Sequence, residues 1–318
     1  MELNIRRYSR DDRELWDDFV RKSRNATFLF DRGYMDYHSD RFADCSWMAY
    51  KGDKLVAILP ANVDSSGVLH SHQGLTYGGW LLPPSHLDGS DLLEIFQLAV
   101  EIWKAEGIIA LDYKPLPWIY SAQPSQEDVY VLFRMGATVS EINLSSAINL
   151  SYPIHYNKLR KRTLRKSSEL RVIIDETDDS EKFMQMVKTC LQDRHDTHPV
   201  HTAREISILK ERFPENIRMF ALRLEDRPED GFQAGVMVYD TGRVAHAQYI
   251  ASTPLGRELN LLTPLFDWLI RERYSDKAYF DFGISNEDHG RYLNSGLLRQ
   301  KFSYGATGVA YQRWELKI

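Results

Sequence analysis

Three side chains able to move protons lie in neighbouring apolar stretches of the second half of the chain. His246 and Tyr249 belong to one stretch, and Asp281 ends the next one. Histidine can act as a base near neutral pH, tyrosine can protonate a leaving group, and a carboxylate can orient or deprotonate a nucleophile. Structural interpretations exist too, because histidine and tyrosine also occur in buried strands and Asp281 could cap the loop at Asn286. We take Asp281, His246 and Tyr249 as candidate catalytic residues.

The segment that follows Tyr249 has the residue types of an anion-binding loop. Pro254, Gly256 and Arg257 stand just before a helical pattern. Backbone N–H groups at the start of a helix can hold a phosphate, glycine lets the backbone approach a ligand, and arginine adds positive charge. A loop with proline and glycine is more often only a loop. The predicted cofactor-binding residues are Thr253, Leu255, Gly256, Arg257, Glu258, Leu259 and Asn260.

Three histidines at three-residue spacing, His195, His198 and His201, raise the question of a metal site. Pro199 breaks the helix that would align them, and no cysteine or glutamate completes a standard zinc ligand set. We therefore predict no metal. The alternative is a loop at the border of a substrate cleft, with His198 and His201 as polar contacts.

The first half of the chain offers a comparable polar group. His70 and His72 precede Tyr77 and the glycines at 78–79, which would permit close approach of a ligand. We predict that His72 and Tyr77 are substrate contacts in a groove between the two halves.

Hydrophobic periodicity predicts the strands and helices that would position these residues. In the first half, strands are predicted at residues 3–7, 47–51, 54–65, 75–82 and 108–113, and helices at 11–20, 33–41 and 90–105. In the second half, strands are predicted at residues 170–175, 219–225, 231–240, 244–251 and 278–282, and helices at 180–192, 204–212 and 261–272.

One strand–helix–strand order occurs in each half, and each copy ends in an aspartate, Asp112 or Asp281. The two copies are residues 75–82, 90–105 and 108–112, and residues 244–251, 261–272 and 278–281. A repeat at domain scale indicates duplication, although any α/β chain can offer two such units by chance. We predict an α/β (α+β) fold of two tandem domains, 1–150 and 151–318, each a mixed sheet flanked by helices.

Composition excludes several classes of protein. A length of 318 residues is typical of about two domains, and a net charge of −5 argues against a protein wrapped in nucleic acid. Two cysteines cannot form a disulfide framework and favour a reducing compartment. The N-terminus lacks the apolar stretch of a signal peptide, and no apolar run has the length of a membrane span. We expect a soluble cytoplasmic protein.

A basic run, residues 158–166, lies at the predicted domain boundary. Its cations are Lys158, Arg160, Lys161, Arg162, Arg165 and Lys166. Such a run is usually a solvated helix. The alternative is a contact with the phosphates of CoA, of tRNA or of a nucleotide-linked acceptor, and the acidic total charge favours a small partner over a long nucleic acid.

Segments of the second half resemble motifs of one protein group. Residues 279–285, YFDFGIS, resemble the "DFGGS" strand end of the Fem-type peptidoglycan peptidyltransferases and of related GNAT-like acetyltransferases. Residues 296–305, GLLRQKFSYG, resemble the group's "GLxxFKxxFG", and residues 159–166 resemble its "RxxIRKA". The sequence departs from the group at Ile284, where a second glycine is usual, and at Gln300, where phenylalanine is preferred.

The resemblance covers the second half well and the first half more loosely, through residues 55–61 and 75–79. It implies two tandem GNAT-like domains and acyl transfer from a thioester or from an aminoacyl-tRNA. Lys301 falls on the lysine of the group's motif and is a candidate to hold a phosphate or an oxyanion. Tyr279 and Ser285, in the strand-end motif, are predicted substrate contacts.

Three functional hypotheses follow from the resemblance. The first is an N-acetyltransferase that uses acetyl-CoA or another acyl-CoA. It would act on an amine or amino-sugar acceptor, in cell-envelope or capsular polysaccharide synthesis, by direct attack. The second is an aminoacyl-tRNA-dependent peptidyltransferase, against which the sequence shows no long helical arm for tRNA. The third is a non-catalytic binding protein on a duplicated scaffold, since the acetyl-CoA loop Q/R-x-x-G-x-G/A is absent from the second half.

Overall fold

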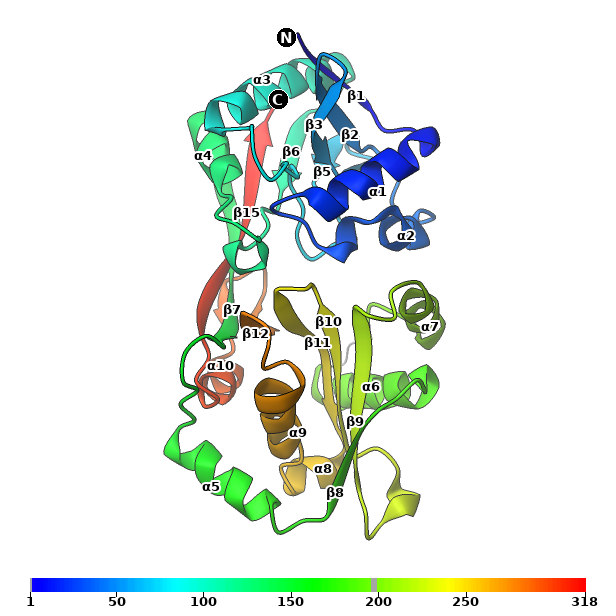
Figure 1. Cartoon of the computed structure of the whole chain (residues 1–318), viewed down its shortest axis with the longest axis vertical. Helices are drawn as coiled ribbons and strands as arrows, with labels where there is room; N and C mark the ends of the chain where they lie inside the picture. Colours follow the sequence, from blue (N-terminus) through cyan, green and yellow to red (C-terminus); the bar gives the residue numbers. More distant parts are fainter. Residues whose placement is uncertain (1, 196–198) are drawn as a thin grey trace. The chain divides into compact units, whose positions relative to one another are not determined.

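The computed structural model describes residues 2–195 and 199–318, which form two compact units (Figure 1). Unit 1 consists of Met1–Leu144, Asn286–Tyr292 and Ala310–Ile318, and unit 2 consists of Ser145–Ser285 and Leu293–Val309. The contiguous division expected at residue 150 therefore differs from the observed one. The reason is that the C-terminal strand β15 (Thr307–Lys317) returns to pair with β6 (Ala110–Tyr113) of unit 1.

Unit 2 is built on a mixed sheet in the order β7-β12-β11-β10-β9-β8. Its strands are β7 (Thr138–Asn149), which begins in unit 1, β8 (Val172–Glu176), β9 (Ile217–Leu224), β10 (Ala234–Asp240), β11 (Val244–Ser252) and β12 (Tyr279–Ile284). Its helices are α5 (Lys158–Ser167), α6 (Ser180–His195), α7 (Ala203–Arg212), α8 (Pro254–Glu258), α9 (Leu262–Trp268) with a π-helical extension (Leu269–Arg273), and α10 (Ser295–Phe302).

The two faces of this sheet are covered by different helices. Val236 of β10 packs in one apolar core with Leu265 and Phe266 of α9. The neighbouring Gly235 faces the other side, where an added Cβ would lie 2.6 Å from Met186 of α6. Because successive strand residues point to opposite faces, α9 and α6 lie on opposite sides of the sheet.

Unit 1 holds two sheets and its own core. One sheet has the order β1-β2-β3, and the other contains β4-β5-β6-β15. The remaining strands are β1 (Leu3–Arg7), β2 (Trp47–Lys51), β3 (Lys54–Leu59), β4 (Asn62–Val63) and β5 (Val68–His70), with the small pair β13 (Asn286–Glu287) and β14 (Tyr292–Leu293). The helices are α1 (Arg13–Lys22), α2 (Arg32–Met35), α3 (Gly89–Ala105) and α4 (Glu127–Arg134).

Helix α3 shows why its sequence forms this element. The side chain of Asp88 accepts hydrogen bonds from the backbone of Ser90 and Asp91 and caps the helix. Its apolar face, which includes Phe96 and Trp103, packs into the core of unit 1 with residues of β6 and β15. The predicted helix at 90–105 is therefore present almost unchanged.

The expected duplication is present, but one of its strands was assigned wrongly. In unit 1 the strand parallel to β6 is β5, and residues 75–82 make only isolated bridges, Ile58↔Leu81 and Gly78↔Pro115. The backbone at Gly78 approaches the carbonyl of Ser71 so closely that an added Cβ would lie 1.7 Å from its oxygen. A chain folded back this tightly cannot form a continuous ladder.

Other boundaries differ for local reasons. The predicted strand 54–65 divides into β3 and β4 around Pro60, which has no N–H for a ladder. The predicted helix 33–41 is shorter, as α2 followed by a 3₁₀ turn at Asp36–His38. Within the described residues, no helix combines the length and apolar character that crossing a bilayer requires.

Candidate active site

The parallel strands β11 and β12 separate at the two residues that the sequence singles out. Their register runs from Val244↔Tyr279 to His246↔Asp281. Beyond that pair, β11 continues along β10 to Ser252, whereas the next partner of β12 is Ser145 of β7, opposite Ile284. His246 and Asp281 therefore lie side by side where the two strands part.

A hydrogen-bonded chain fixes the imidazole of His246. Its Nδ1 lies 2.8 Å from Oδ2 of the fully buried Asp281. The other carboxylate oxygen accepts hydrogen bonds from Ser145 Oγ at 2.6 Å and from the backbone N–H of Gly283 at 3.2 Å. An ionised carboxylate only accepts, so the imidazole donates from Nδ1 and has Nε2 as its basic nitrogen. The His246 side chain is 13% exposed, which makes it accessible to a reactant.

Gly283 explains the Asp-x-Gly pattern of this strand end. Its φ of +77° lies in the left-handed region that favours glycine, and its N–H turns back to the side chain of Asp281. A Cβ at this position would lie 3.5 Å from Cε1 of His246, so the backbone of Gly283 runs directly beside the imidazole.

Lys301 of α10 reaches the same strand end. Its Nζ donates hydrogen bonds to the carbonyl oxygens of Gly283 at 2.8 Å and Ile284 at 2.6 Å. Burial lowers the pKa of Lys301 to about 8, and the negative charge of Asp281 acts in the opposite direction. The structure thus brings Asp281 and Lys301 together, as the sequence predicts.

Tyr249 shares a face of the sheet with His246 because of a register shift. Met237 pairs with Tyr249 and Val238 pairs with Ala247, so one extra residue lies between them on β11. The Tyr249 hydroxyl lies 2.8 Å from Nδ1 of His201, and burial raises the pKa of Tyr249 to about 12. Two predicted site residues, Tyr249 and His201, therefore form one contact.

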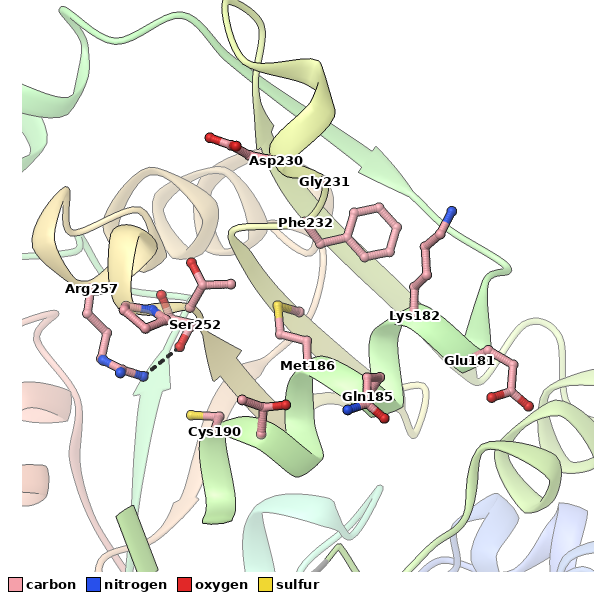
Figure 2. A pocket seen from close by; sticks show the side chains of 13 residues that line it. Glu181, Lys182, Gln185, Met186, Cys190, Asp230, Gly231, Phe232, Ser252 and Arg257 are labelled. Atoms are coloured by element: carbon pink, nitrogen blue, oxygen red, sulfur yellow. Dashed lines mark hydrogen bonds between the residues drawn. The ribbon is translucent and has the colours of Figure 1, made fainter. Parts of the chain in front are cut away.

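A pocket of about 540 Å³ opens at the end of β11 (Figure 2). Met186 and Cys190 of α6 and Phe232 of the loop before β10 supply apolar surface. Arg257 lies to one side, where its Nη1 donates to the carbonyl of Ser252 at 2.9 Å, as the dashed line in Figure 2 shows. The full lining is Glu181, Lys182, Gln185, Met186, Thr189, Cys190, Asp230, Gly231, Phe232, Ser252, Thr253, Pro254 and Arg257.

Only some of the predicted cofactor-binding residues lie at the pocket. Thr253 and Arg257 line it. Leu255 and Leu259 pack against the apolar core that contains α9, and Glu258 and Asn260 are exposed. Gly256 is buried, and an added Cβ would lie 2.0 Å from the backbone oxygen of Gln233. The close approach that this glycine permits in the structure is to the backbone of Gln233, the residue before β10.

The remaining predicted substrate contacts lie in different places. Ser285 is buried at the end of β12, and among the described residues its hydroxyl has no hydrogen-bond partner. Tyr279 begins β12, and the guanidinium of Arg243 lies over its ring. His72 and Tyr77 belong to unit 1, where both are buried, so neither is an open contact surface within that unit. His198 lies outside the described residues.

Sequence reasoning missed Ser145 and the α6 side of the pocket. Ser145 stands 136 residues before Asp281, in a strand with no motif of its own. Met186 and Cys190 look like ordinary core residues of an amphipathic helix. The one available signal for Ser145 was its place in a strand that pairs with β12, which needs the topology.

Unit 1 contains a second histidine–aspartate pair in the equivalent register. His70 lies opposite Asp112, and its Nδ1 is 2.6 Å from Asp112 Oδ2. Here Nε2 is also bound, at 2.8 Å from Asp64, and Arg313 donates two hydrogen bonds of 2.6 Å to Asp112. Both imidazole nitrogens are occupied, so this copy is an ion-pair network within unit 1. Within the described ranges, no group of three or more histidine, cysteine or acidic side chains is placed to hold a metal ion.

Solved structures share this architecture over more than nine tenths of their length. FemX matches with a TM-score of 0.69 and 11% identity, over 100% of this chain and 98% of that chain. L-PGS from Bacillus licheniformis matches with a TM-score of 0.59 and 10% identity, over 96% of this chain and 91% of that chain. A tandem GNAT protein from the clavulanic acid biosynthesis pathway was solved without acetyl-CoA. It matches with a TM-score of 0.55 and 12% identity, over 99% of this chain and 98% of that chain. The chain therefore has the tandem GNAT-like fold.

Neither a protein-family model nor a curated protein matches this sequence.

Proposed function

We propose that the chain is an acyltransferase with its reaction centre in unit 2, where β11 and β12 part. One observation carries the proposal. At this point His246, with a fixed tautomer, is hydrogen-bonded to the buried carboxylate of Asp281. The ammonium group of Lys301 is hydrogen-bonded to the end of β12, the strand that contains Asp281. A base and a nearby positive charge are what attack of an amine on an acyl group requires.

In this proposal His246 accepts a proton from the acceptor amine and then donates it to the leaving group. The amine nitrogen attacks the carbonyl carbon of a thioester, and its proton passes to Nε2 of His246. As the new C–N bond is completed, the C–S bond breaks and the imidazolium returns the proton to the leaving thiolate. Asp281 keeps the imidazole oriented and stabilises its charged form, while Ser145 and Gly283 hold Asp281.

Lys301 is proposed to stabilise the negative charge that develops on the acyl oxygen. Two of its three N–H groups donate to Gly283 and Ile284, which holds the ammonium in place. With a pKa of about 8, Lys301 is mostly charged at neutral pH. A fixed ammonium in a buried site stabilises an oxyanion more than a solvated one does.

The donor is proposed to be an acyl thioester with a long arm. Arg257 and Thr253 line the pocket at one end of β11, and His246 lies six residues away along the strand. One of these six residues is the extra residue of β11, so at about 3.3 Å per step the separation along the strand is about 17 Å. A donor held by its anionic end at Arg257 therefore needs an arm of pantetheine length to present its acyl group at His246. The apolar surface of Met186, Cys190 and Phe232 suits an uncharged part of such a molecule.

The acceptor is proposed to be an amine, and an amino sugar of envelope or capsular polysaccharide synthesis is the expectation from the sequence resemblance. The buried hydroxyl of Ser285, which has no partner among the described residues, supports a polar ligand at the end of β12. Tyr249 and His201 are proposed as further polar contacts on the same face of the sheet as His246.

Calorimetric titration with acetyl-CoA, free CoA and charged tRNA tests the donor assignment. We expect binding of acetyl-CoA and CoA, and weaker binding of both in Arg257→Gln. His246→Asn should bind acetyl-CoA like the native protein but should not release thiol from it in the presence of amine acceptors. Failure of all three probes to bind would favour a non-catalytic binding protein.

A second candidate is transfer from an aminoacyl-tRNA. The likeness to FemX, which spans both chains almost completely, favours it, because the sequence motifs also resemble the Fem-type group. Binding of charged tRNA without binding of acetyl-CoA would replace the first proposal by this one.

A further inference from the structure

The exposed face of α5 concentrates positive charge. Lys158, Lys161, Arg162, Arg165 and Lys166 are all exposed. At 100° per residue these five side chains fall within an arc of about 140° on one side of the helix. Figure 1 shows α5 at the outer edge of unit 2. The exposure of the five side chains shows that their side of the helix is open to solvent.

The sixth cation of the helix has a different role. Arg160 donates from Nε to Ser303 Oγ at 3.0 Å and from Nη1 to Thr263 Oγ1 at 2.5 Å, and its guanidinium lies over the ring of Tyr304. These contacts fix α5 to the body of unit 2. The basic face is consequently held in one orientation.

Within the described residues, none of the five exposed cations forms an ion pair with a carboxylate. The sequence from 150 to 168 has no acidic residue, and Glu169 follows directly after it. Lys158 and Arg162, and likewise Lys161 and Arg165, stand four residues apart, where like charges repel and weaken a helix. An arrangement that costs stability, in a chain of net charge −5, points to an external partner that supplies negative charge.

Exposed apolar side chains accompany the basic face. Leu159 is 59% exposed and Phe302 is 63% exposed. Leu159 lies at the edge of the basic arc, next to Lys166 on the helix surface. A backbone hydrogen bond from Asn157, the N-cap of α5, to Ser303 places the end of α10, and hence Phe302, at the N-terminal end of α5.

We infer that this face, together with Leu159 and Phe302, docks on an anionic lipid surface. A row of lysines and arginines on a convex helix fits a flat layer of negatively charged headgroups, and apolar side chains beside it can enter the boundary of the acyl chains. A nucleic acid would use the cations as well, but its phosphate backbone offers no partner for Leu159. The inference does not depend on the proposed function.

Vesicle pelleting of the full chain tests this inference. We expect binding to phosphatidylcholine vesicles that contain phosphatidylglycerol, little binding to pure phosphatidylcholine, and a decrease with added salt. The double variant Lys161→Gln/Arg165→Gln should bind the anionic vesicles roughly 25-fold more weakly, at about fivefold per cation. Leu159→Ser should weaken binding to anionic vesicles while leaving the charge unchanged.

A matched control removes the same charge elsewhere. Lys188→Gln/Arg204→Gln neutralises two exposed cations of α6 and α7 and should bind vesicles like the native protein. Circular dichroism confirms that every variant is folded. The inference is overturned if the native protein binds both vesicle types equally. It is also overturned if the control variant loses as much vesicle binding as Lys161→Gln/Arg165→Gln. It is also overturned if Lys161→Gln/Arg165→Gln loses binding to an RNA hairpin while vesicle binding is unaffected.

Discussion

In the proposed mechanism, His246 can act as a base because other residues hold its imidazole in one orientation. Asp281 holds its Nδ1, and Ser145 and Gly283 occupy the second oxygen of that carboxylate. The carboxylate therefore cannot rotate away without losing two hydrogen bonds. The basic nitrogen is held where the strands part.

Replacement of His246 by asparagine should lower the rate of acyl transfer from acetyl-CoA by about 100-fold or more, because a positioned base typically contributes that much. Asp281→Asn should lower the rate by about 10- to 100-fold, since the imidazole loses its orienting partner. Steady-state rates of thiol release with a panel of amine acceptors measure both effects. Native rates in His246→Asn would remove this residue from the mechanism.

The lowered pKa of Lys301 leads us to expect a pH-dependent rate. Its pKa is lowered to about 8, so the ammonium is present below that pH and is lost as pH rises through it. The rate should therefore fall on the alkaline side with an apparent pKa near 8. Lys301→Arg should move this limb to higher pH because a guanidinium keeps its charge. If the alkaline fall of the rate keeps the same apparent pKa in Lys301→Arg, another group causes that fall.

At the scale of elements, the packing of α8 against Gln233, the residue before β10, shapes the pocket. Gly256 lets α8 lie against the backbone of Gln233, and the side chain of Thr253 caps the helix through the N–H of Gly256. Thr253 and Arg257 then line the pocket from one short helix.

Gly256→Ala should destabilise the protein by about 1–3 kcal/mol, the usual cost of forcing extra atoms into a packed site. The new Cβ would lie 2.0 Å from a backbone oxygen that cannot move independently. Gly296→Ala in α10 is the matched control, because its Cβ would meet only Asn294 at 3.6 Å and alanine favours a helix. Urea unfolding should show a loss for the first variant and a small gain for the second. Equal stabilities would contradict the packing described for α8.

The sequence predicts most elements because their apolar patterns are long and regular, as in α3 and β10. It fails at β5, which has only three residues and shows no periodicity. The pattern at 75–82 looks like a strand, but Gly78 folds back on Ser71. Short strands take their place from tertiary pairing, which a local pattern does not contain.

The candidate site divides in the same way. Asp281 and Lys301 could be found because they stand in motifs, and His246 because its residue type is rare in an apolar strand. Ser145 and the α6 wall of the pocket could not, because only the fold brings them to the site.

At the scale of the whole molecule, the two units carry the same pair in different settings. His246 and Asp281 in unit 2 are held by a serine and a backbone N–H, whereas His70 and Asp112 in unit 1 are enclosed by Asp64 and Arg313. The pair of unit 1 therefore belongs to an ion-pair network, whereas the proposed reaction centre contains the pair of unit 2.

Asp112→Asn should therefore lower stability by about 1–3 kcal/mol, because partly buried charges lose their partner. The pKa of Asp112 is lowered to about 2, so its stabilising contribution is present above the ordinary value and is lost as pH falls through about 2. The rate per folded molecule should stay unchanged, in contrast to Asp281→Asn. A catalytic defect in folded Asp112→Asn would contradict the division of roles.

Hydrogen–deuterium exchange of the full chain with and without acetyl-CoA tests the central claim most directly. We predict slower exchange in peptides that cover β11 with α8 and in those that cover β12, since a bound thioester would contact both strands. Binding of acetyl-CoA with protection confined to residues of unit 1 would contradict a reaction centre at His246 and Asp281, and no change at any concentration would contradict the thioester donor.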